Sequence, residues 1–256
     1  MSAIVPVYHP RRDARVAVRR GYPRRSGGVR LCRGLAGVER LLAARLVDAV
    51  VLDVKADPAP ALALAGRYPR IPVFALSAFK ADDGRLLAAC LAAGFAGVLV
   101  EGVDNAVAGE WIAARTAQAA RREALVQAPR LLRLTEPLQR QAWEEVLRRV
   151  GGPTHTGEIA GALSVTREHL SRQFGAGGAP NLKRVIDLAR IACAADLLAN
   201  PAYTVRSVVR ILSYASPSHL SAASRRVAGV PPHELAGLGP GGVLSRFLKG
   251  RTRSRL

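Results

Sequence analysis

The pattern of apolar and polar positions changes character near the middle of the chain. Up to about residue 104, short apolar runs typical of strands alternate with stretches whose apolar residues recur at helical spacing. The predicted strands are 14–18, 29–32, 48–53, 71–76 and 96–100, and the predicted helices between them are 38–46, 59–67 and 82–93. Continuous apolar strands separated by helices predict a parallel sheet covered on both faces.

The stretch Asn105–Gln127 differs from what precedes it. It has no strand pattern and few helix breakers, and apolar residues recur at Val107, Trp111 and Leu125. We therefore expect a long helix that leads out of the α/β domain, with a linker at residues 128–137.

From residue 138 onward the pattern is helical, and one helical pair is written twice. The first copy is Glu158-Ile159-Ala160 followed by residues 163–174, and the second is residues 205–209 followed by 212–221. Each copy is a short amphipathic helix, a break of small or polar residues, and a helix with Ser or Thr near its start. This is the layout of a helix-turn-helix.

Charge narrows the choice of partner. The formal net charge is +19 and the pI is about 11.4, which favours polyanions such as nucleic acid or an anionic membrane. The longest nearly apolar stretch, Leu86–Val100, contains Gly94 and Gly97 and is too short to span a bilayer. The first residues lack the pattern of a signal peptide. We therefore expect a cytoplasmic protein that binds nucleic acid and no membrane.

Catalytic chemistry finds no support in the sequence. No glycine-rich phosphate loop follows an N-terminal strand, and no nucleophile, base and orienting residue can be named together. The three Cys and five His residues show no metal-ligand spacing. We predict no enzyme activity, no catalytic residue, no metal site and no cofactor.

The first domain resembles the receiver domain of bacterial response regulators over about residues 14–120. The resemblance lies in Leu52-Asp53, Leu76-Ser77-Ala78 and the segment Gly94–Val100. It implies a flavodoxin-like parallel sheet, with Asp53 at the position of the phosphoacceptor.

The charges around that position depart from the receiver pattern. Aspartyl phosphorylation requires Mg²⁺ held by an acidic pair after the first strand and a Lys cation. Arg19 and Arg20 stand where the acids belong, and Glu101 replaces the Lys. We expect a degenerate pocket, formed by Arg19, Arg20, Asp53, Ser77 and Glu101, that works without phosphorylation. Two arrangements remain open. Either Arg19 or Arg20 pairs with Asp53 or Glu101, or the arginines are solvated and Asp53 caps a strand.

The second domain resembles the DNA-binding domain of the AraC/XylS family over about residues 136–236. The resemblance is carried by 170–174, by Arg190-Ile191 with Ala194 and Leu197-Leu198, by 204–209, and by 229–234. It implies about seven helices, with two helix-turn-helix units joined by a rigid helix at 182–198. Such units read successive major grooves about 34 Å apart. Ser164 and Ser213 replace the usual turn glycines, and Leu220–Ser224 lacks the family's aromatic and Arg.

Candidate DNA contacts follow from the helical faces. Leu170 and Phe174, four residues apart, mark the buried side of the first unit's second helix. The open side then carries Arg167, Glu168, Ser171 and Arg172. Arg172 is the first candidate to read a guanine. In the second unit the candidates are Ser218, His219 and Ala222 for the groove, and Arg225 and Arg226 for phosphates. We expect the first unit to carry most of the specificity.

The predicted organisation is a basic segment (1–13), a receiver-like domain with its exit helix (14–127), a linker (128–137), a double helix-turn-helix domain (138–236) and a basic disordered tail (237–256). The predicted function is a sequence-specific transcription regulator, as activator or repressor. Its partners are double-stranded DNA, a second copy through the N-terminal domain or exit helix, and RNA polymerase. Alternatives are a phosphorylated response regulator, an α/β ligand-binding or enzymatic domain fused to a DNA-binding module, and a nucleoid-type protein that binds DNA through charge alone.

Overall fold

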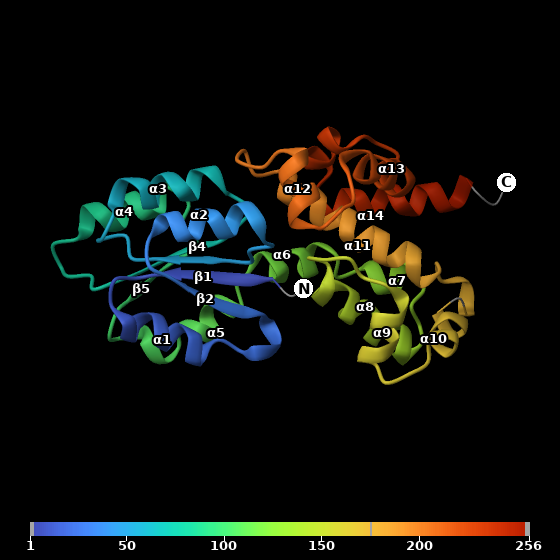
Figure 1. Ribbon diagram of the computed structural model, residues 1–256, viewed down its shortest axis with the longest axis horizontal. Helices are drawn as coiled ribbons and strands as arrows, with labels where there is room; N and C mark the ends of the chain where they lie inside the picture. Colours follow the sequence, from blue (N-terminus) through green and yellow to red (C-terminus); the bar gives the residue numbers. More distant parts are fainter. Residues whose placement is uncertain (1–2, 175, 254–256) are drawn as a thin grey trace. The chain divides into compact units, whose positions relative to one another are not determined.

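The computed structural model describes residues 3–174 and 176–253, which form two compact units (Figure 1). The first unit contains Ala3–Ala120 with Asn200–Ala202, and the second contains Arg121–Ala199 with the chain from Tyr203 onward. No helix within the described residues is long and apolar enough to cross a membrane.

A five-stranded parallel sheet forms the centre of the first unit. Its strands are β1 (Ile4–Tyr8), β2 (Gly28–Cys32), β3 (Val50–Leu52), β4 (Val73–Ser77) and β5 (Gly97–Val100), in the order β2-β1-β3-β4-β5. The helices are α1 (Arg12–Gly21), α2 (Leu35–Ala44), α3 (Pro58–Arg67), α4 (Gly84–Ala92) and α5 (Ala108–Ala113), with short 3-10 turns η1 (Arg24–Ser26) and η2 (Asp104–Ala106). Figure 1 shows α1 and α5 on one face and α2, α3 and α4 on the other. This is the flavodoxin-like doubly wound order, so the predicted fold class is confirmed.

The core of this unit lies between the sheet and the pair α1 and α5. Val7, Val51 and Phe74 from three neighbouring strands are completely buried, as are Val18 of α1 and Ile112 of α5. Continuous apolar strands were the signal for this arrangement, and the strands predicted at 29–32, 48–53, 71–76 and 96–100 are confirmed as β2 to β5.

The prediction for the first strand was wrong. Residues 14–18 lie within the helix α1, where Ala14 and Val18 are buried four positions apart. The true strand β1 is Ile4–Tyr8, inside the segment predicted to be loose. Pro6 obscured it, because proline is expected only on edge strands or at bulges. On the β3 side, Ile4 lies opposite Val47 and Val7 opposite Val51, so the chain leading into β3 has one residue more between these pairs than β1 has.

The prediction of one long exit helix at 105–127 was also wrong. The chain forms η2, α5 and then α6 (Ala117–Ala124), with turns between them. The two compact units divide between Ala120 and Arg121, ahead of the predicted linker, and α7 (Ala128–Leu131) lies where that linker was expected. The apolar spacing was helical, but it belonged to several short helices.

The second unit is all helical. After α6 and α7 it contains α8 (Pro137–Arg149), α9 (Thr156–Ala162), α10 (Arg167–Phe174), η3 (Ala176–Gly178), α11 (Leu182–Leu198), α12 (Val205–Ile211), α13 (Pro217–Ala228), η4 (Pro232–Glu234) and α14 (Leu235–Arg253). The bounds of α11 coincide with the helix predicted at 182–198.

The basic tail was expected to be disordered, and this was wrong for most of it. Residues up to Arg253 form α14, and residues 254–256 lie outside the described part of the chain. Val243, Leu244 and Phe247 are buried, and α14 packs against α11 and α13. The guanidinium of Arg184 lies 5.1 Å from the centroid of the Phe247 ring. The basic residues and glycines of the tail suggested disorder, but three apolar residues at helical spacing anchor the segment.

A close contact between α1 and α5 yields the first prediction. A methyl group at Gly109 would lie 2.1 Å from the carbonyl carbon of Gly21, a backbone atom that cannot rotate away. Gly109→Ala should therefore destabilise the first unit by about 1–3 kcal/mol, the usual cost of overpacking. The measurement is urea unfolding followed by Trp111 fluorescence in a Trp143→Phe background.

Gly66→Ala is the matched control, since Gly66 also lies in a helix but has open space where its methyl group would go. Its unfolding midpoint should stay the same or rise slightly, because alanine favours the helix. Equal midpoints for the two variants would contradict the close packing of α1 on α5.

Candidate nucleic-acid interface

The first helix-turn-helix unit is α9, a four-residue turn and α10. Ile159 of α9 and Leu170 and Phe174 of α10 are buried, so the two helices pack through the face that the sequence predicted. The hydroxyl oxygen of Thr166 accepts a hydrogen bond from the backbone N–H of His169 at 3.2 Å, which caps the start of α10. Local sequence therefore fixes where the second helix of the unit begins.

Helix α8 holds the other end of α10. The side chain of Gln139 is completely buried, and its amide nitrogen donates to the backbone oxygens of Gln173 at 3.0 Å and Phe174 at 3.2 Å. The last carbonyls of a helix have no partner within the helix. Gln139 supplies one for α10, so the orientation of this helix is fixed at both ends.

The two predicted turn positions have the backbone conformation that a helix-turn-helix requires. Ser164 has φ of 56° and Ser213 has φ of 53°, which lie in the left-handed region. Both serines were singled out as replacements for glycine, and the structure confirms that they occupy these strained positions.

The candidate contact residues of α10 all point away from the core. Arg167, Glu168, Ser171 and Arg172 are exposed, as their spacing from Leu170 and Phe174 predicted. None of the four forms an ion pair with another described residue. Their polar groups are therefore available to a ligand outside the protein.

The second helix-turn-helix unit, formed by α12 and α13, repeats this geometry. Ser216 caps α13 by accepting a hydrogen bond from the N–H of His219 at 3.1 Å. Ser218, His219 and Ala222 are exposed on α13, and so is Arg225. The exposed face that the sequence predicted for this helix is therefore present, although its side chains are shorter than those of α10.

Arg226 differs from the other candidates because it has an intramolecular partner. Its guanidinium lies 3.0 Å from a carboxylate oxygen of Asp187 on α11. The side chains are 53% and 23% exposed, and an ion pair this exposed contributes only about 0–1 kcal/mol to stability. The pair is weak enough to be exchanged for another anion.

The missing aromatic residue of α13 has a specific replacement. Ser224 occupies the position equivalent to Phe174, four residues after the buried Leu220, and is itself completely buried. Its hydroxyl donates to the backbone oxygen of Val230 at 2.6 Å. A buried hydroxyl without a partner would be costly, so this hydrogen bond makes Ser224 compatible with the core.

The spacer helix α11 joins the two helix-turn-helix units. It is also hydrogen-bonded to the turn between α12 and α13. A guanidinium nitrogen of Arg190 donates to the backbone oxygen of Leu212 at 2.6 Å, and the guanidinium lies 4.3 Å from the centroid of the Tyr214 ring. The Tyr214 ring in turn meets the His219 ring edge to face, with centroids 5.8 Å apart. Burial raises the pKa of Tyr214 to about 12, so its hydroxyl stays neutral.

One cleft lies between the two helix-turn-helix units. It has a volume of about 690 Å³ and is bordered by Arg167, the first residue of α10, and by His219 near the start of α13. Between them lie side chains of α11. The starts of both exposed helices therefore border the same cleft.

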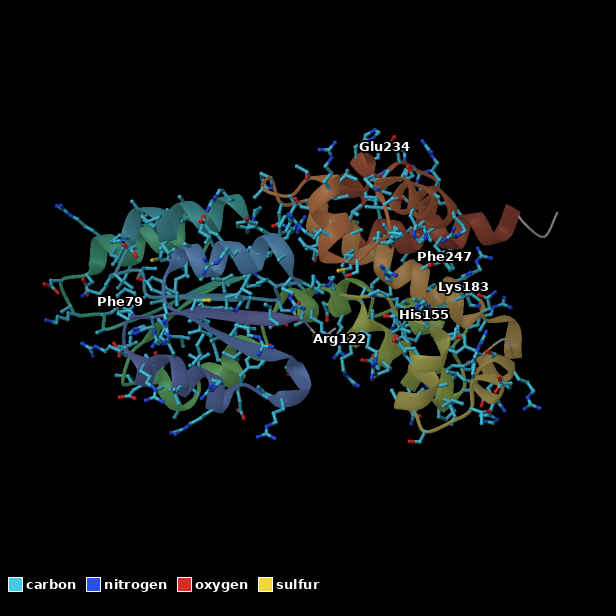
Figure 2. All side chains as sticks on the ribbon, in the orientation of Figure 1. Phe79, Arg122, His155, Lys183, Glu234 and Phe247 are labelled. Carbon is cyan, nitrogen blue, oxygen red and sulfur yellow. The ribbon has the colours of Figure 1, made fainter. Side chains whose placement is uncertain are left out.

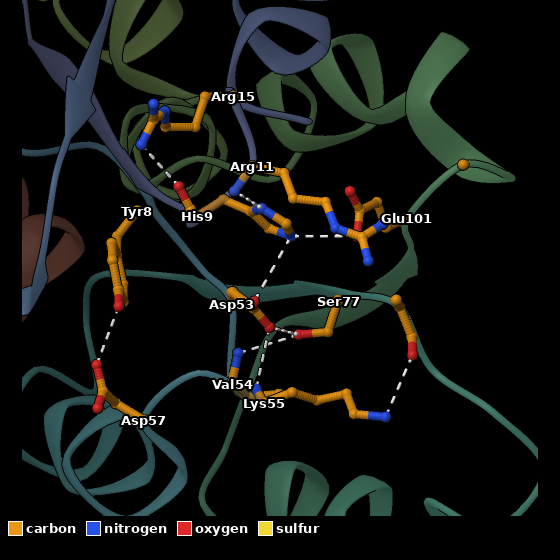
Figure 3. Close-up of polar contacts among 12 residues, drawn as sticks. Tyr8, His9, Arg11, Arg15, Asp53, Val54, Lys55, Asp57, Ser77 and Glu101 are labelled. Carbon is orange, nitrogen blue, oxygen red and sulfur yellow. Dashed lines mark hydrogen bonds and ion pairs between the residues drawn. The ribbon is translucent and has the colours of Figure 1, made fainter. Parts of the chain in front are cut away.

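The second candidate site lies in the α/β unit, at the carboxyl ends of its strands. His9 follows β1, Asp53 follows β3, Ser77 ends β4 and Glu101 follows β5 (Figure 3). In doubly wound folds, ligands bind at this edge, where the strand order reverses. Asp53, Ser77 and Glu101 were predicted to meet here, and the structure brings them together.

One oxygen of Asp53 is hydrogen-bonded, and the other faces His9 at a longer distance. One accepts hydrogen bonds from the Ser77 hydroxyl and from the backbone N–H of Lys55 at 3.0 Å. The other lies 3.7 Å from Nε2 of His9, which also lies 3.5 Å from a carboxylate oxygen of Glu101. Arg11 approaches the same Glu101 oxygen at 3.4 Å.

The backbone determines which nitrogen of His9 carries the proton. Nδ1 accepts a hydrogen bond from the N–H of Arg11 at 3.1 Å, so Nδ1 bears a lone pair and the proton of the neutral ring is assigned to Nε2. Nε2 is buried without a hydrogen-bond partner of its own and faces both carboxylates. His9 therefore directs an N–H into the space between Asp53 and Glu101.

Arg19 and Arg20 are not part of this pocket, so the expected degenerate pocket does not include them. Of the two arrangements left open, the pairing with Asp53 or Glu101 is not found among the described residues, and both arginines are solvated. Both are exposed in the last turn of α1. The expected internal donors exist, but they are His9 and Arg11, which directly follow β1. The sequence signal that could have found them is the apolar run Ile4–Tyr8 ending in a polar His.

Lys55, the nearest lysine to Asp53 in the sequence, is turned toward a different partner. Its ammonium lies 2.6 Å from a carboxylate oxygen of Asp83 and 3.2 Å from the backbone oxygen of Ala78. The Lys55 hydrogen bond lowers the pKa of the Asp83 carboxyl below its usual value. The Lys55 cation thus stabilises the loop before α4.

Mg²⁺, which the receiver resemblance implies, does not fit these side chains. It requires an octahedron of oxygen ligands, usually with one or two free carboxylates. Here the Nε2–H of His9 points at both carboxylates, and the Arg11 guanidinium is close to Glu101. Within the described residues, no group of three or more His, Cys, Asp and Glu is arranged to hold a metal ion.

A doubly wound α/β unit followed by two helix-turn-helix units on one spacer defines the class: a two-domain DNA-binding transcription regulator. Comparison with protein families agrees for the second unit, because residues 159–237 match the family described as "Helix-turn-helix domain", of the AraC type. This stretch is an AraC-type DNA-binding domain.

No match is found among the curated proteins. Among solved structures, full-length FixJ from B. japonicum is similar, with 15% identity, coverage of 89% of this chain and 98% of that chain, and a TM-score of 0.37.

The strained turn serines give the second prediction. A non-glycine residue in the left-handed region costs about 1–2 kcal/mol of stability. Glycine removes this strain, but it loses more conformational entropy on folding, which offsets part of the gain. Ser164→Gly should therefore raise the stability of the helical unit by about 0.5–1 kcal/mol in urea unfolding followed by Trp143 fluorescence in a Trp111→Phe background. Ser171→Gly, within α10, should lower it. Destabilisation by both changes would refute the strain at Ser164.

Proposed function

We propose that the protein binds a specific double-stranded DNA sequence through α10 and α13, which act as recognition helices in successive major grooves, and thereby regulates transcription. The observation that carries the proposal is the shared cleft, which is bordered by the starts of both helices. Two recognition helices can enter neighbouring grooves of one DNA face only when both open to the same side.

The first recognition helix has the side chains that read bases. Arg172 and Arg167 are exposed, and arginine donates two parallel hydrogen bonds to guanine in the major groove. Glu168 and Ser171 lie on the same open face and match cytosine or a variable base edge. Specificity is therefore proposed to come mainly from α10.

The second recognition helix has less capacity for direct readout. Ser218, His219 and Ala222 are exposed, but none reaches as far as an arginine. Arg225 and Arg226 lie in the last turn of α13 and are proposed to hold phosphates, which positions the protein without reading sequence. The role of α13 is thus mainly to set the register of α10 on the DNA.

We propose that the receiver-like domain acts without phosphorylation and is not an enzyme. Its support is the environment of Asp53, in which His9 and Arg11 stand where a metal would be needed. A domain held in one state by internal contacts suits a fixed surface for a second copy of the chain or for RNA polymerase. Whether the protein activates or represses depends on where its site lies relative to a promoter.

The third prediction tests base reading by Arg172. After a cognate site has been selected from a random DNA pool with the full chain, Arg172→Ala should weaken binding to that site by about 1–3 kcal/mol, roughly 5- to 160-fold in Kd, and change binding to random DNA little. Titrations on both DNAs at fixed salt measure this. Arg85→Ala, an exposed arginine of α4, removes the same charge and should affect neither. Equal losses on both DNAs would refute base reading by Arg172.

The fourth prediction concerns Asp53. Incubation with acetyl phosphate and Mg²⁺ should leave the mass of the intact protein unchanged, because the environment of Asp53 binds neither the metal nor the phosphoryl group. Asp53→Asn serves as the control for labelling at other carboxylates. Stoichiometric labelling of the unmodified chain that disappears in Asp53→Asn would show that the domain is a working receiver.

A further inference from the structure

The cleft between the two helix-turn-helix units has a floor formed by one face of α11. Lys183, Ile186, Asp187 and Arg190 line it at spacings of three and four residues, which is one stripe of a helix. Thr154 to Gly157, at the start of α9, and Arg226 of α13 complete the walls. Figure 2 labels two of these residues, His155 and Lys183. The cleft therefore runs along the spacer, between the two recognition helices.

The lining of the cleft is strongly basic. Four of its side chains are Arg or Lys, and Asp187 is its one acid. Arg190 is held by Leu212 and Tyr214, and Arg226 by Asp187. Among the described residues, Arg167 and Lys183 form no ion pair. An uncompensated pair of cations in a cleft raises the local concentration of anions.

The position of the cleft identifies the anion. Between two successive major grooves on one face of DNA lies a minor groove flanked by two sugar-phosphate backbones, so a protein surface between two recognition helices meets phosphates. The cleft offers cations, which match phosphodiesters. Arg167 and His219 lie where the recognition helices meet the cleft, and Arg172, the first candidate for reading a base, is not among its lining residues.

We propose that this cleft binds the phosphodiester backbone of the DNA segment between the two major grooves, with Lys183 as a direct contact and Asp187 as a residue that lowers its affinity. The inference rests on the proposed function and names the contacts that set sequence-independent affinity. In the free protein Asp187 holds Arg226. On DNA a phosphate replaces Asp187 as the partner of Arg226.

Asp187 thereby lowers the affinity for every duplex by the same factor, and the ratio of cognate to random affinity does not change. Its carboxylate repels the backbone of any duplex, whereas the base contacts of α10 are made only on the right sequence. An acid in this place reduces binding to random DNA, and the added attraction of a cognate site compensates for it.

The experiment measures Kd on the selected cognate site and on random DNA across a salt series, with the full chain. Lys183→Ala should weaken binding to both DNAs by the same factor and reduce the salt slope by about one, as loss of a phosphate contact does. Asp187→Asn should tighten binding to both by the same factor. Lys80→Ala, an exposed lysine of the other unit, is the matched control and should change neither Kd nor slope.

A double-mutant cycle tests the exchange of partners. If Arg226 moves from Asp187 to a phosphate, the gain from Asp187→Asn should be smaller in an Arg226→Ala background than alone. Equal gains would overturn the exchange. Thermal unfolding of each variant confirms that the fold is retained, and Lys183→Arg, which keeps the charge, should restore the salt slope if Lys183→Ala lowers it.

The outcomes separate this inference from the proposed function. If no DNA sequence is preferred and Arg172→Ala has no effect, the proposed function fails. If Arg172→Ala removes the preference but Lys183→Ala behaves like Lys80→Ala, the proposed function stands and the phosphate cleft is overturned. Selective loss on the cognate site in Lys183→Ala would also overturn it, because Lys183 would then read bases.

Discussion

The packing of α11 is the constraint on which the helix-turn-helix domain depends. Eleven of its 17 residues are buried, and it packs against α8, α12, α13 and α14. A helix buried on several sides cannot rotate about its own axis without disrupting the core. The two recognition helices are attached to it through Gln139 of α8 on one side and Arg190 on the other. Their relative orientation is therefore a property of the core.

Those two attachments use the same physical device. Gln139 donates to the last carbonyls of α10, and Arg190 donates to the carbonyl of Leu212, which follows the last turn of α12. Helix ends have unpaired carbonyls that need donors when they are buried. By supplying these donors from neighbouring helices, the fold links backbone hydrogen bonding to the positions of α10 and α13. The positions of α10 and of the turn before α13 therefore depend on these two donors.

The sequence predicted the parts of the fold in which one apolar pattern corresponds to one element. Strands β2 to β5 and the helix α11 agree with the predicted ranges, and the turn serines Ser164 and Ser213 were singled out because they replace glycines of the family that the domain resembles. The prediction failed where two rules competed. Pro6 argued against a central strand, yet β1 pairs with β2 on one side and β3 on the other. The error moved the first strand by one element, so the pocket was assigned Arg19 and Arg20.

Other features depend on contacts that no local pattern encodes. The tail of the chain is rich in glycine and arginine, and only its packing against α11 shows that Val243 and Phe247 are anchors. Arg226 was predicted to be a phosphate contact, and its ion pair with Asp187 joins residues 39 positions apart. The shared cleft is likewise formed by residues from four helices and the loop before α9.

The two clusters of charged and polar side chains differ in burial, so the contacts of one are harder to break than those of the other. In the α/β unit, the side chains of His9, Asp53 and Glu101 are at most 10% exposed, so separating them would leave polar groups in the interior without partners. In the helical unit, Arg226 is 53% exposed and its pair with Asp187 is screened by water and salt. A phosphate can replace Asp187 at little cost, whereas no external ion can replace His9 so easily. The contacts of His9 are therefore fixed by burial, whereas the exposed pair of Arg226 and Asp187 can separate at little cost.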